Sequence, residues 1–246
     1  MSETEHRHGR RRPRILVLLL CLTLLITAAL LYLKKDTVNT PFSVLILGDS
    51  QMAGNGWSGG YANCIAEVYP NAQVVNLAQS GSLLSNGDIL AQWEFYRTEA
   101  SIMPDFVLLD GGINDLSLLR KTGFQEEGLA LVRNSLCSII EQIHEVSPDT
   151  HILYLVMPPF AEWKDTEEGL PSYDIQRLYW KQMHITANTY DYVTVVDLFT
   201  LNPFQYPSAA SYRKHLADNI HLSEAGYRKT FEHFQNILTA HLETAG

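Results

Sequence analysis

The sequence predicts an α/β fold in which five strands form a central, mostly parallel sheet that helices cover on both faces. Short apolar runs alternate along the chain with longer stretches of helical periodicity, and strands buried on both faces of a parallel sheet read as such runs. Polar residues and glycines gather directly after these runs, as is typical of the carboxyl edge of a parallel sheet. With 246 residues, 46% of them hydrophobic, the chain suits one domain with a sizeable core.

Each strand is predicted from a short run of mainly apolar residues. The first, at 44–47, reads Val-Leu-Ile-Leu, and another, at 106–109, follows Pro104. The remaining runs are rich in Val, Ile, Leu and Tyr, which favour buried strands, and lie at 73–78, 152–156 and 192–196.

The helices are predicted from apolar residues at steps of three or four. The clearest case is 125–146, in which six apolar residues recur at this spacing before Pro148 ends the pattern. Pro70 likewise ends a shorter helix at 61–69. Further helices are predicted at 89–98, 173–189 and 223–242, the last with Ser223 as its candidate N-cap.

A different pattern precedes the first strand. Residues 15–33 are uncharged and almost all Leu, Ile, Val and Ala, and as a helix they would span about 28 Å, close to the thickness of a bilayer's hydrocarbon core. More basic residues precede this run than follow it, so the positive-inside rule places residues 1–14 in the cytoplasm as a basic tail. We expect a transmembrane helix or signal anchor at 15–33, a linker at 34–41 and one domain outside the cytoplasm at 42–246. A cleaved signal peptide is the alternative, and it would leave that domain secreted.

Charge and cysteine content exclude several function classes. Residues 36–246 carry 11 Lys or Arg and 25 Asp or Glu, a formal net charge of −14, so we expect no nucleic-acid partner, which would need a basic face. Cys64 and Cys137 suit either one disulfide or two buried thiols. The sequence has no spacing typical of metal-binding, Walker A or dinucleotide-binding motifs, so we expect no metal and no cofactor. It predicts no particular oligomeric state.

Four loops at the predicted carboxyl edge hold the residue types of a serine nucleophile and its base. A hydroxyl nucleophile needs a base that takes its proton, and the base needs an acid that fixes its tautomer. Asp218 and His221 lie three residues apart, so the carboxylate can reach the imidazole within one turn. Asn114 can donate its amide to an oxyanion, and Asp197 is either an alternative acid or a helix cap. The loops lie at 48–50, 79–81, 110–115 and 218–221.

These blocks make the sequence similar to the SGNH or GDSL hydrolase family, named after the Ser, Gly, Asn and His of its four blocks. The blocks stand here in the family's order and span most of the domain after the linker. The resemblance implies a flavodoxin-like, three-layer α/β/α fold. It also implies Ser50 as the nucleophile, His221 as the general base and then acid, and Asp218 as the residue that orients His221. The oxyanion hole would consist of the backbone N–H groups of Ser50 and Gly81 with the Asn114 side chain.

The sequence departs from the commonest family pattern beside two of these residues. Gln51 stands where an apolar residue is usual, and Ile113 where a small one is usual. We expect both to shape the acyl pocket. Trp57, Phe160 and Trp163 are further candidates for its walls, although ordinary packing explains aromatic residues about as well.

Ser58 is a rival nucleophile, because Gly-Trp-Ser-Gly-Gly at 56–60 fits the nucleophile-elbow pattern. That motif should follow a buried strand, and residues 51–55 cannot form one. We therefore expect Ser50 to be the nucleophile and the glycines at 54, 56, 59 and 60 to form a flexible rim beside it.

The sequence thus predicts a membrane-anchored serine esterase that acts outside the cytoplasm. We expect its substrate to be a small-molecule or glycan ester, in particular an O-acetyl group on a cell-surface or wall glycan. Two alternatives use the same residues: a lysophospholipase or thioesterase acting on lipids, and an O-acyltransferase in which a glycan hydroxyl replaces water. A non-catalytic surface-binding protein is a third, and it would have no need of the full set of catalytic residues.

Overall fold

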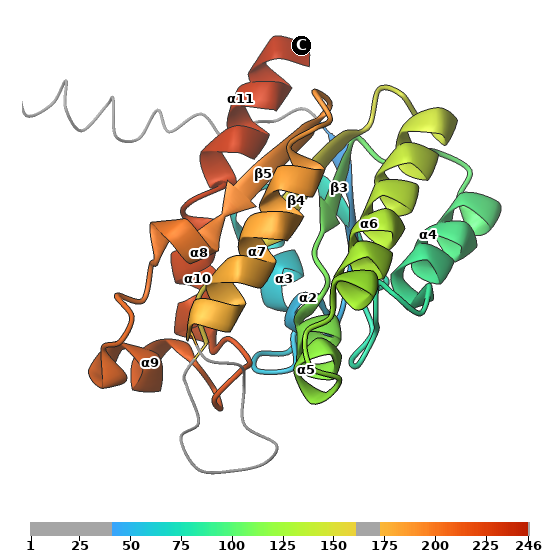
Figure 1. Ribbon diagram of the computed structural model, residues 1–246. Coiled ribbons are helices and arrows are strands. Elements are labelled where there is room, and N and C mark those ends of the chain that lie inside the picture. The colour runs from blue at the N-terminus through green and yellow to red at the C-terminus, as the bar shows by residue number, and fades with distance from the viewer. Residues whose placement is uncertain (1–40, 161–172, 246) are drawn as a thin grey trace, which may run out of the picture. The chain divides into compact units, whose positions relative to one another are not determined.

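The computed structural model describes residues 41–160 and 173–245, and a five-stranded sheet lies at its centre (Figure 1). The strands lie in the order β2-β1-β3-β4-β5, and every neighbouring pair is parallel. The predicted parallel sheet is therefore confirmed, and all five carboxyl ends lie along one edge. The strands are β1 (Phe42–Leu47), β2 (Ala72–Asn76), β3 (Phe106–Leu109), β4 (His151–Val156) and β5 (Val193–Asp197).

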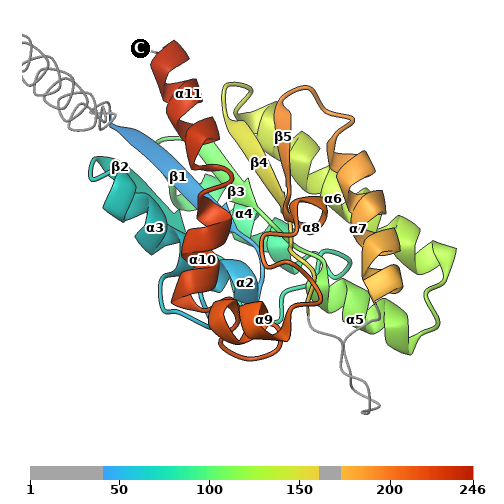
Figure 2. The same ribbon diagram turned by 90° about the vertical axis from the view of Figure 1, so that its left-hand side faces the viewer.

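Longer helices cover both faces of this sheet and complete the predicted three layers (Figure 2). On one face α6 packs between α4 and α7, and on the other α3 packs against α10, with α11 continuing from it. The amphipathic α6 turns its apolar stripe, including Leu136 and Ile139, into the core. These helices are α3 (Gly60–Val68), α4 (Asp88–Glu99), α6 (Glu126–Val146), α7 (Tyr173–Ala187), α10 (Glu224–Phe231) and α11 (Gln235–Ala245).

The single closing helix predicted at 223–242 is wrong, because the structure has α10 and α11 there. Between them the Phe234 N–H donates to the Phe231 carbonyl, three residues back, which tightens the chain locally. The tighter turn carries Phe234 into the core, where its ring meets that of Tyr61 edge-on at a centroid distance of 5.3 Å. Apolar periodicity does not record such a turn, since the apolar residues on both sides keep helical spacing.

Four further helices at or near the carboxyl edge were not predicted from the sequence. Three have side-chain caps that satisfy a free backbone N–H: Asp49 for α2, Asp197 for α8 and Ser208 for α9. Asp197 is therefore a cap, one of its two predicted roles. The four helices are α2 (Ser50–Ala53), α5 (Ile113–Lys121), α8 (Leu198–Leu201) and α9 (Ala209–His215).

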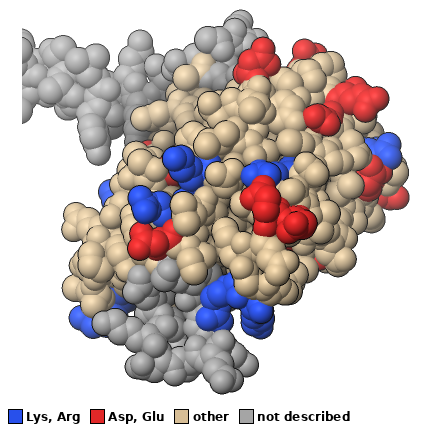
Figure 3. All heavy atoms as spheres, in the orientation of Figure 1, with Lys and Arg blue, Asp and Glu red and all other residues tan. Residues whose placement is uncertain are grey.

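The predicted basic tail, the predicted membrane helix at 15–33 and nearly all of the predicted linker lie outside the described residues. None of the helices that the structure describes is long and apolar enough to cross a bilayer. Residues Thr40–Gly246 form one compact unit. On the face drawn in Figure 3, acidic side chains are more frequent toward the top and basic ones toward the bottom, and both signs lie side by side between them.

Cys64 and Cys137 are free thiols rather than a disulfide, and of the two predicted buried thiols Cys64 is buried whereas Cys137 is only partly buried. Cys64 is buried in α3, and this burial raises the pKa of its thiol to about 12. At neutral pH the thiol is therefore protonated and unreactive.

Leu108 tests the position of the core. It is fully buried in β3, between β1 and β4. Leu108→Ala should lower the free energy of unfolding by about 2–5 kcal/mol, because it removes buried methyl groups and leaves a cavity. Leu131→Ala in α6 is the control, with an expected loss below about 1 kcal/mol, since that side chain is 52% exposed. Chemical denaturation measures both, and equal losses would contradict the placement of Leu108 in the core.

Candidate active site

Ser50 begins α2 directly after β1, at the carboxyl edge of the sheet. The turn before it needs glycine, because Gly48 has a φ of +150° and a Cβ there would lie 2.1 Å from Asp110 Oδ1. Asp49 then caps the helix by accepting a hydrogen bond from the Gln51 N–H at 2.9 Å. The turn is thus held from both sides, and Ser50 has a defined orientation.

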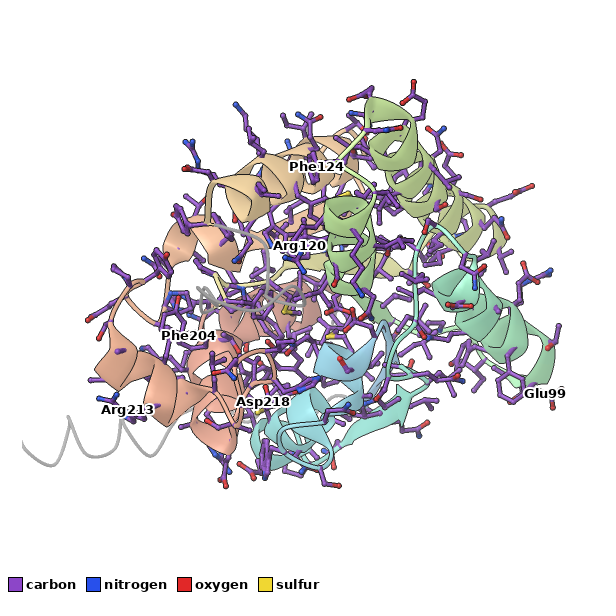
Figure 4. The ribbon with its side chains drawn as sticks, turned by 60° about the horizontal axis from the view of Figure 1, so that its bottom comes forward. Glu99, Arg120, Phe124, Phe204, Arg213 and Asp218 are labelled. Carbon is purple, nitrogen blue, oxygen red and sulfur yellow. The ribbon has the colours of Figure 1, made fainter. Side chains whose placement is uncertain are left out.

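The loop between α9 and α10 brings His221 to this serine. His221 Nε2 lies 3.0 Å from Ser50 Oγ, and its Nδ1 lies 2.7 Å from Asp218 Oδ2. The other carboxylate oxygen, Asp218 Oδ1, accepts from the backbone N–H groups of Ile220 and His221, both at 2.7 Å. One carboxylate therefore folds the loop and orients the imidazole. Figure 4 shows Asp218 where the C-terminal segment meets the segment of α2 and α3.

These contacts assign the tautomer of His221. The Asp218 carboxylate only accepts, so the Nδ1 atom carries the proton and Nε2 is free to accept one from the Ser50 hydroxyl. Partial burial of Asp218 favours its neutral form, but the hydrogen bonds from His221 and Ile220 outweigh it and hold the carboxyl pKa below its usual value. Asp218 therefore stays ionised at neutral pH.

The Asn114 side chain joins the loops that follow three strands. It lies in the first turn of α5, and its Nδ2 donates to the Ser82 carbonyl at 3.0 Å and lies 3.4 Å from Asp49 Oδ2. Gly81 precedes Ser82, with a φ of +84° and nothing within 4 Å of where a Cβ would stand. The structure therefore brings Ser50, Gly81, Asn114, Asp218 and His221, the predicted residues of all four blocks, to one edge of the sheet.

Two further side chains, which the sequence analysis missed, hold the loop around Gly81. Gln92 in α4 pairs with both the N–H and the carbonyl of Gly48, each at 2.9 Å, and also donates to Ser82 Oγ. The Asp115 carboxylate accepts from the N–H groups of Leu84 and Ser85 at 2.8 and 3.0 Å. Gln92 is far from the blocks in sequence, and a helical glutamine gives no signal of such a role.

Two buried carboxyl groups, Asp49 and Asp110, lie side by side behind the nucleophile. The Asp49 N–H donates to Asp110 Oδ1 at 3.3 Å. Burial raises the pKa of Asp49 to about 7, against the opposing effect of the hydrogen bond from Gln51. Burial, and next the charge of Asp49, raise the pKa of Asp110 well above its usual value, so Asp110 keeps its proton to a higher pH than an exposed aspartate does.

Most of the predicted pocket walls are buried. Gln51 and Phe160 are 0% and 1% exposed, and Ile113, at 5%, is about as buried as Ser50, which is 6% exposed. Trp57 is partly exposed but packs against Tyr227 and the Arg228 guanidinium, which lies 5.2 Å from its ring centroid. Trp163 lies outside the described residues.

A cavity of about 550 Å³ lies beside the Gly81 loop instead. It shares Gly81 and Ser82 with the site, and Phe95 stands at its wall with 58% of the residue exposed. The cavity is formed by the loop after β2 and by α4, and it depends on how these consecutive segments fold against each other. Its lining residues are Leu77, Gln79, Ser80, Gly81, Ser82, Asp88, Ala91, Gln92 and Phe95.

Neither rival residue has the contacts of a triad. Ser58 is exposed on the loop between α2 and α3, where its carbonyl accepts from Asn63 Nδ2 at 2.7 Å. Asp197 caps α8 and lies 3.1 Å from the Nδ1 atom of His184, not near His221. The predicted preference for Ser50 and Asp218 thus matches the geometry.

The family model described as the GDSL-like Lipase/Acylhydrolase family matches residues 46–229 of this chain. The chain belongs to this family. As a GDSL-like hydrolase it is an ester-hydrolysing enzyme, which confirms the predicted family and reaction class. No curated protein sequence matches the chain.

Solved structures share the fold of this GDSL-like hydrolase over most of its length. A lipase/acylhydrolase from Enterococcus faecalis is 19% identical, with a TM-score of 0.60 over 81% of this chain and 96% of the other. An acetylxylan esterase from Geobacillus stearothermophilus is 22% identical, with a TM-score of 0.59 over 81% and 95%. A lipase from a goat rumen metagenome is 18% identical, with a TM-score of 0.58 over 79% and 96%.

Asp110→Asn tests the buried proton. The folded protein keeps a proton on Asp110 that the unfolded chain releases above the ordinary pKa of 3.8, so the free energy of unfolding falls as pH rises above that value. Asparagine keeps the acceptor for the Asp49 N–H and has no proton to release. We therefore expect a shallower decline in melting temperature between about pH 5 and pH 8 for the variant than for the wild type. An equal or a steeper decline would show that the folded protein holds no extra proton on Asp110.

Proposed function

We propose that this enzyme hydrolyses esters through an acyl-enzyme on Ser50. The observation that carries the proposal is the continuous chain of contacts from Ser50 Oγ through His221 to Asp218, at 3.0 and 2.7 Å. Ser50 Oγ attacks the ester carbonyl carbon while His221 Nε2 takes its proton. His221 then returns that proton to the leaving alcohol oxygen, and the acyl group stays on Ser50.

Water completes the cycle. It attacks the acyl carbonyl carbon, gives a proton to His221 Nε2, and the carboxylic acid leaves as that proton returns to Ser50 Oγ. Asp218 stabilises the imidazolium in both halves, since it stays ionised and bound to Nδ1.

The negative oxygen of each tetrahedral intermediate needs donors, and we assign this role to the N–H groups of Ser50 and Gly81 with Asn114 Nδ2. The Asn114 amide is already held in place by its 3.0 Å bond to Ser82, and its longer contact of 3.4 Å to Asp49 is the one that an oxyanion would replace. Donors fixed before the reaction are worth roughly 3–4 kcal/mol each in transition-state stabilisation.

Ser50→Ala and Ser58→Ala, made in the full chain, test the nucleophile. Ser50→Ala should abolish labelling by a fluorophosphonate and lower kcat for p-nitrophenyl acetate by about 10³-fold or more, because no other hydroxyl among the described residues forms a hydrogen bond with His221. Ser58→Ala should leave both within about 2-fold of the wild type. Loss of labelling in Ser58→Ala alone would contradict the assignment.

For the substrate we propose O-acyl groups, mainly O-acetyl, on a cell-surface or wall glycan, outside the cytoplasm. The cavity beside Gly81 supports this class, because it combines polar side chains with the exposed ring of Phe95, on which a sugar can pack. A structural neighbour is named an acetylxylan esterase. The predicted membrane helix would keep the domain at the cell surface, where such glycans lie.

Phe95→Ala tests the sugar subsite. With acetylated xylooligosaccharides as the probe, kcat/KM should fall by about 5-fold to 30-fold, because a stacking surface is lost. Hydrolysis of p-nitrophenyl acetate, which has no sugar, should stay within about 2-fold. Equal losses on both substrates, or none on either, would contradict a glycan site in this cavity.

Two measurements separate the alternatives that use the same residues. Activity that rises from acetyl toward long-chain esters would favour a lipid acylhydrolase. Acetyl groups that appear on an added sugar instead of as free acetate would favour an acyltransferase.

A further inference from the structure

We propose that Gln51 is a positioning residue that holds the His221 loop at the right distance from Ser50. We propose that Gly56 supports the same loop at a second point of contact. This inference rests on the proposed role of His221 as the base for Ser50. It gives a structural role to Gln51, one of the two positions at which this sequence departs from the commonest family pattern, and to the glycines that follow it.

Gln51 connects the two halves of the site one residue away from the reacting atoms. It follows Ser50 directly, and its Nε2 donates to the carbonyl of Ile220 at 2.9 Å, the residue directly before His221. A second tie comes from α10, where the Tyr227 hydroxyl donates to the Gln51 carbonyl. The hydrogen bond between Ser50 and His221 is therefore braced by a parallel bond between their chain neighbours.

The His221 loop needs such an external tie, because its own contacts fix only its internal shape. Asp218 binds the backbone of Ile220 and His221, and the Ala217 N–H donates to the His221 carbonyl at 2.8 Å. All of these bonds join members of one short segment. These bonds within the loop do not set the distance between the imidazole and Ser50. The hydrogen bond from Gln51 to the Ile220 carbonyl sets it.

Gly56 brings the chain after α2 against the same loop. A Cβ on Gly56 would lie 2.1 Å from the carbonyl oxygen of Leu222, the residue directly after His221. A Cβ on Gly60 would lie 3.1 Å from the Tyr227 ring. Gly54 and Gly60 are buried. In the predicted rim, the lack of side chains at Gly56 and Gly60 therefore lets two backbone segments pack together.

The burial of Gln51 excludes a direct role in binding substrate. The residue is fully buried, so a bound ester does not reach its amide. Its effect on the reaction passes through Ile220 and His221. A shift of about 1 Å in a catalytic group can cost as much as about 100-fold in rate, so one positioning bond is enough to matter.

Gln51→Met, made in the full chain, tests the proposal, because methionine has nearly the same length and cannot donate. We expect the rate of fluorophosphonate labelling at Ser50 and kcat for p-nitrophenyl acetate to fall by about 10-fold to 100-fold, with KM within about 2-fold. The downfield proton resonance of the His221 Nδ1–H should persist, because the bond to Asp218 lies within the loop.

Two more variants sharpen the test. Gln51→Glu keeps the length but turns the donor into an acceptor, so it should be at least as slow as Gln51→Met. Gly56→Ala removes no hydrogen bond but pushes the loop away through Leu222, and it should give the same kinetic pattern. Gly56→Ala also keeps the proposal testable if a substitution at Gln51 prevents folding.

Thr150→Val is the matched control. Its hydroxyl is a buried donor to the Pro104 carbonyl at 2.6 Å, at the amino end of β3 and β4, opposite the site. We expect it to lower the melting temperature and leave labelling within about 2-fold. It thus shows what the loss of a buried side-chain bond does when no catalytic group depends on it.

Three results would overturn the proposal. Wild-type labelling rates in Gln51→Met or Gln51→Glu would show that the bond to Ile220 positions nothing. A rate loss accompanied by loss of the His221 proton resonance and a large fall in melting temperature would show a merely structural role. A wild-type protein that is not labelled at Ser50 would overturn the proposed function and this inference with it, so the two failures are distinguishable.

Discussion

Parallel pairing of β1 with both β2 and β3 is the constraint on which the site depends. The register sets Leu47 beside Leu109. The backbone hydrogen bonds between the strands continue one step beyond the strand ends. The Gln79 N–H donates to the Gly48 carbonyl, and the Asp110 N–H donates to the Leu47 carbonyl. The loops after three strands therefore leave the sheet side by side. A slip of one residue in either pairing would turn their side chains to the other face and separate Ser50 from Asn114.

The proposed base is held differently from the proposed nucleophile. His221 comes from a loop that is no part of the sheet and lies 171 residues from Ser50 in sequence. Its position depends on the packing of α2, α3 and α10, and on side-chain bonds such as that from Gln51 to Ile220. The strands thus position the proposed nucleophile and oxyanion donors, whereas a small number of local contacts positions the proposed proton acceptor.

Buried polar groups behind the site complete the backbone hydrogen bonds that the sheet leaves open. Asp115 binds the N–H groups of the Gly81 loop, Gln92 binds Gly48, and Asp110 accepts from Asp49. A loop that turns sharply next to a buried strand exposes such groups, and leaving them unpaired would cost free energy. The carboxyl groups that lie behind the site are buried themselves, and this burial raises the pKa values of Asp49 and Asp110.

The sequence by itself determined the strands, the parallel sheet and the four blocks, and it favoured Ser50 over Ser58, because buried strands, strand-end loops and the step from Asp218 to His221 are local patterns. Only the tertiary structure decided that Gln51 and Phe160 are buried, that α10 and α11 are separate, and that a cavity lies beside Gly81. The first two features arise where segments far apart in the chain meet, and the cavity arises where the loop after β2 folds against α4. Burial and contact depend on the partner segment, and no spacing within one segment records which partner that will be.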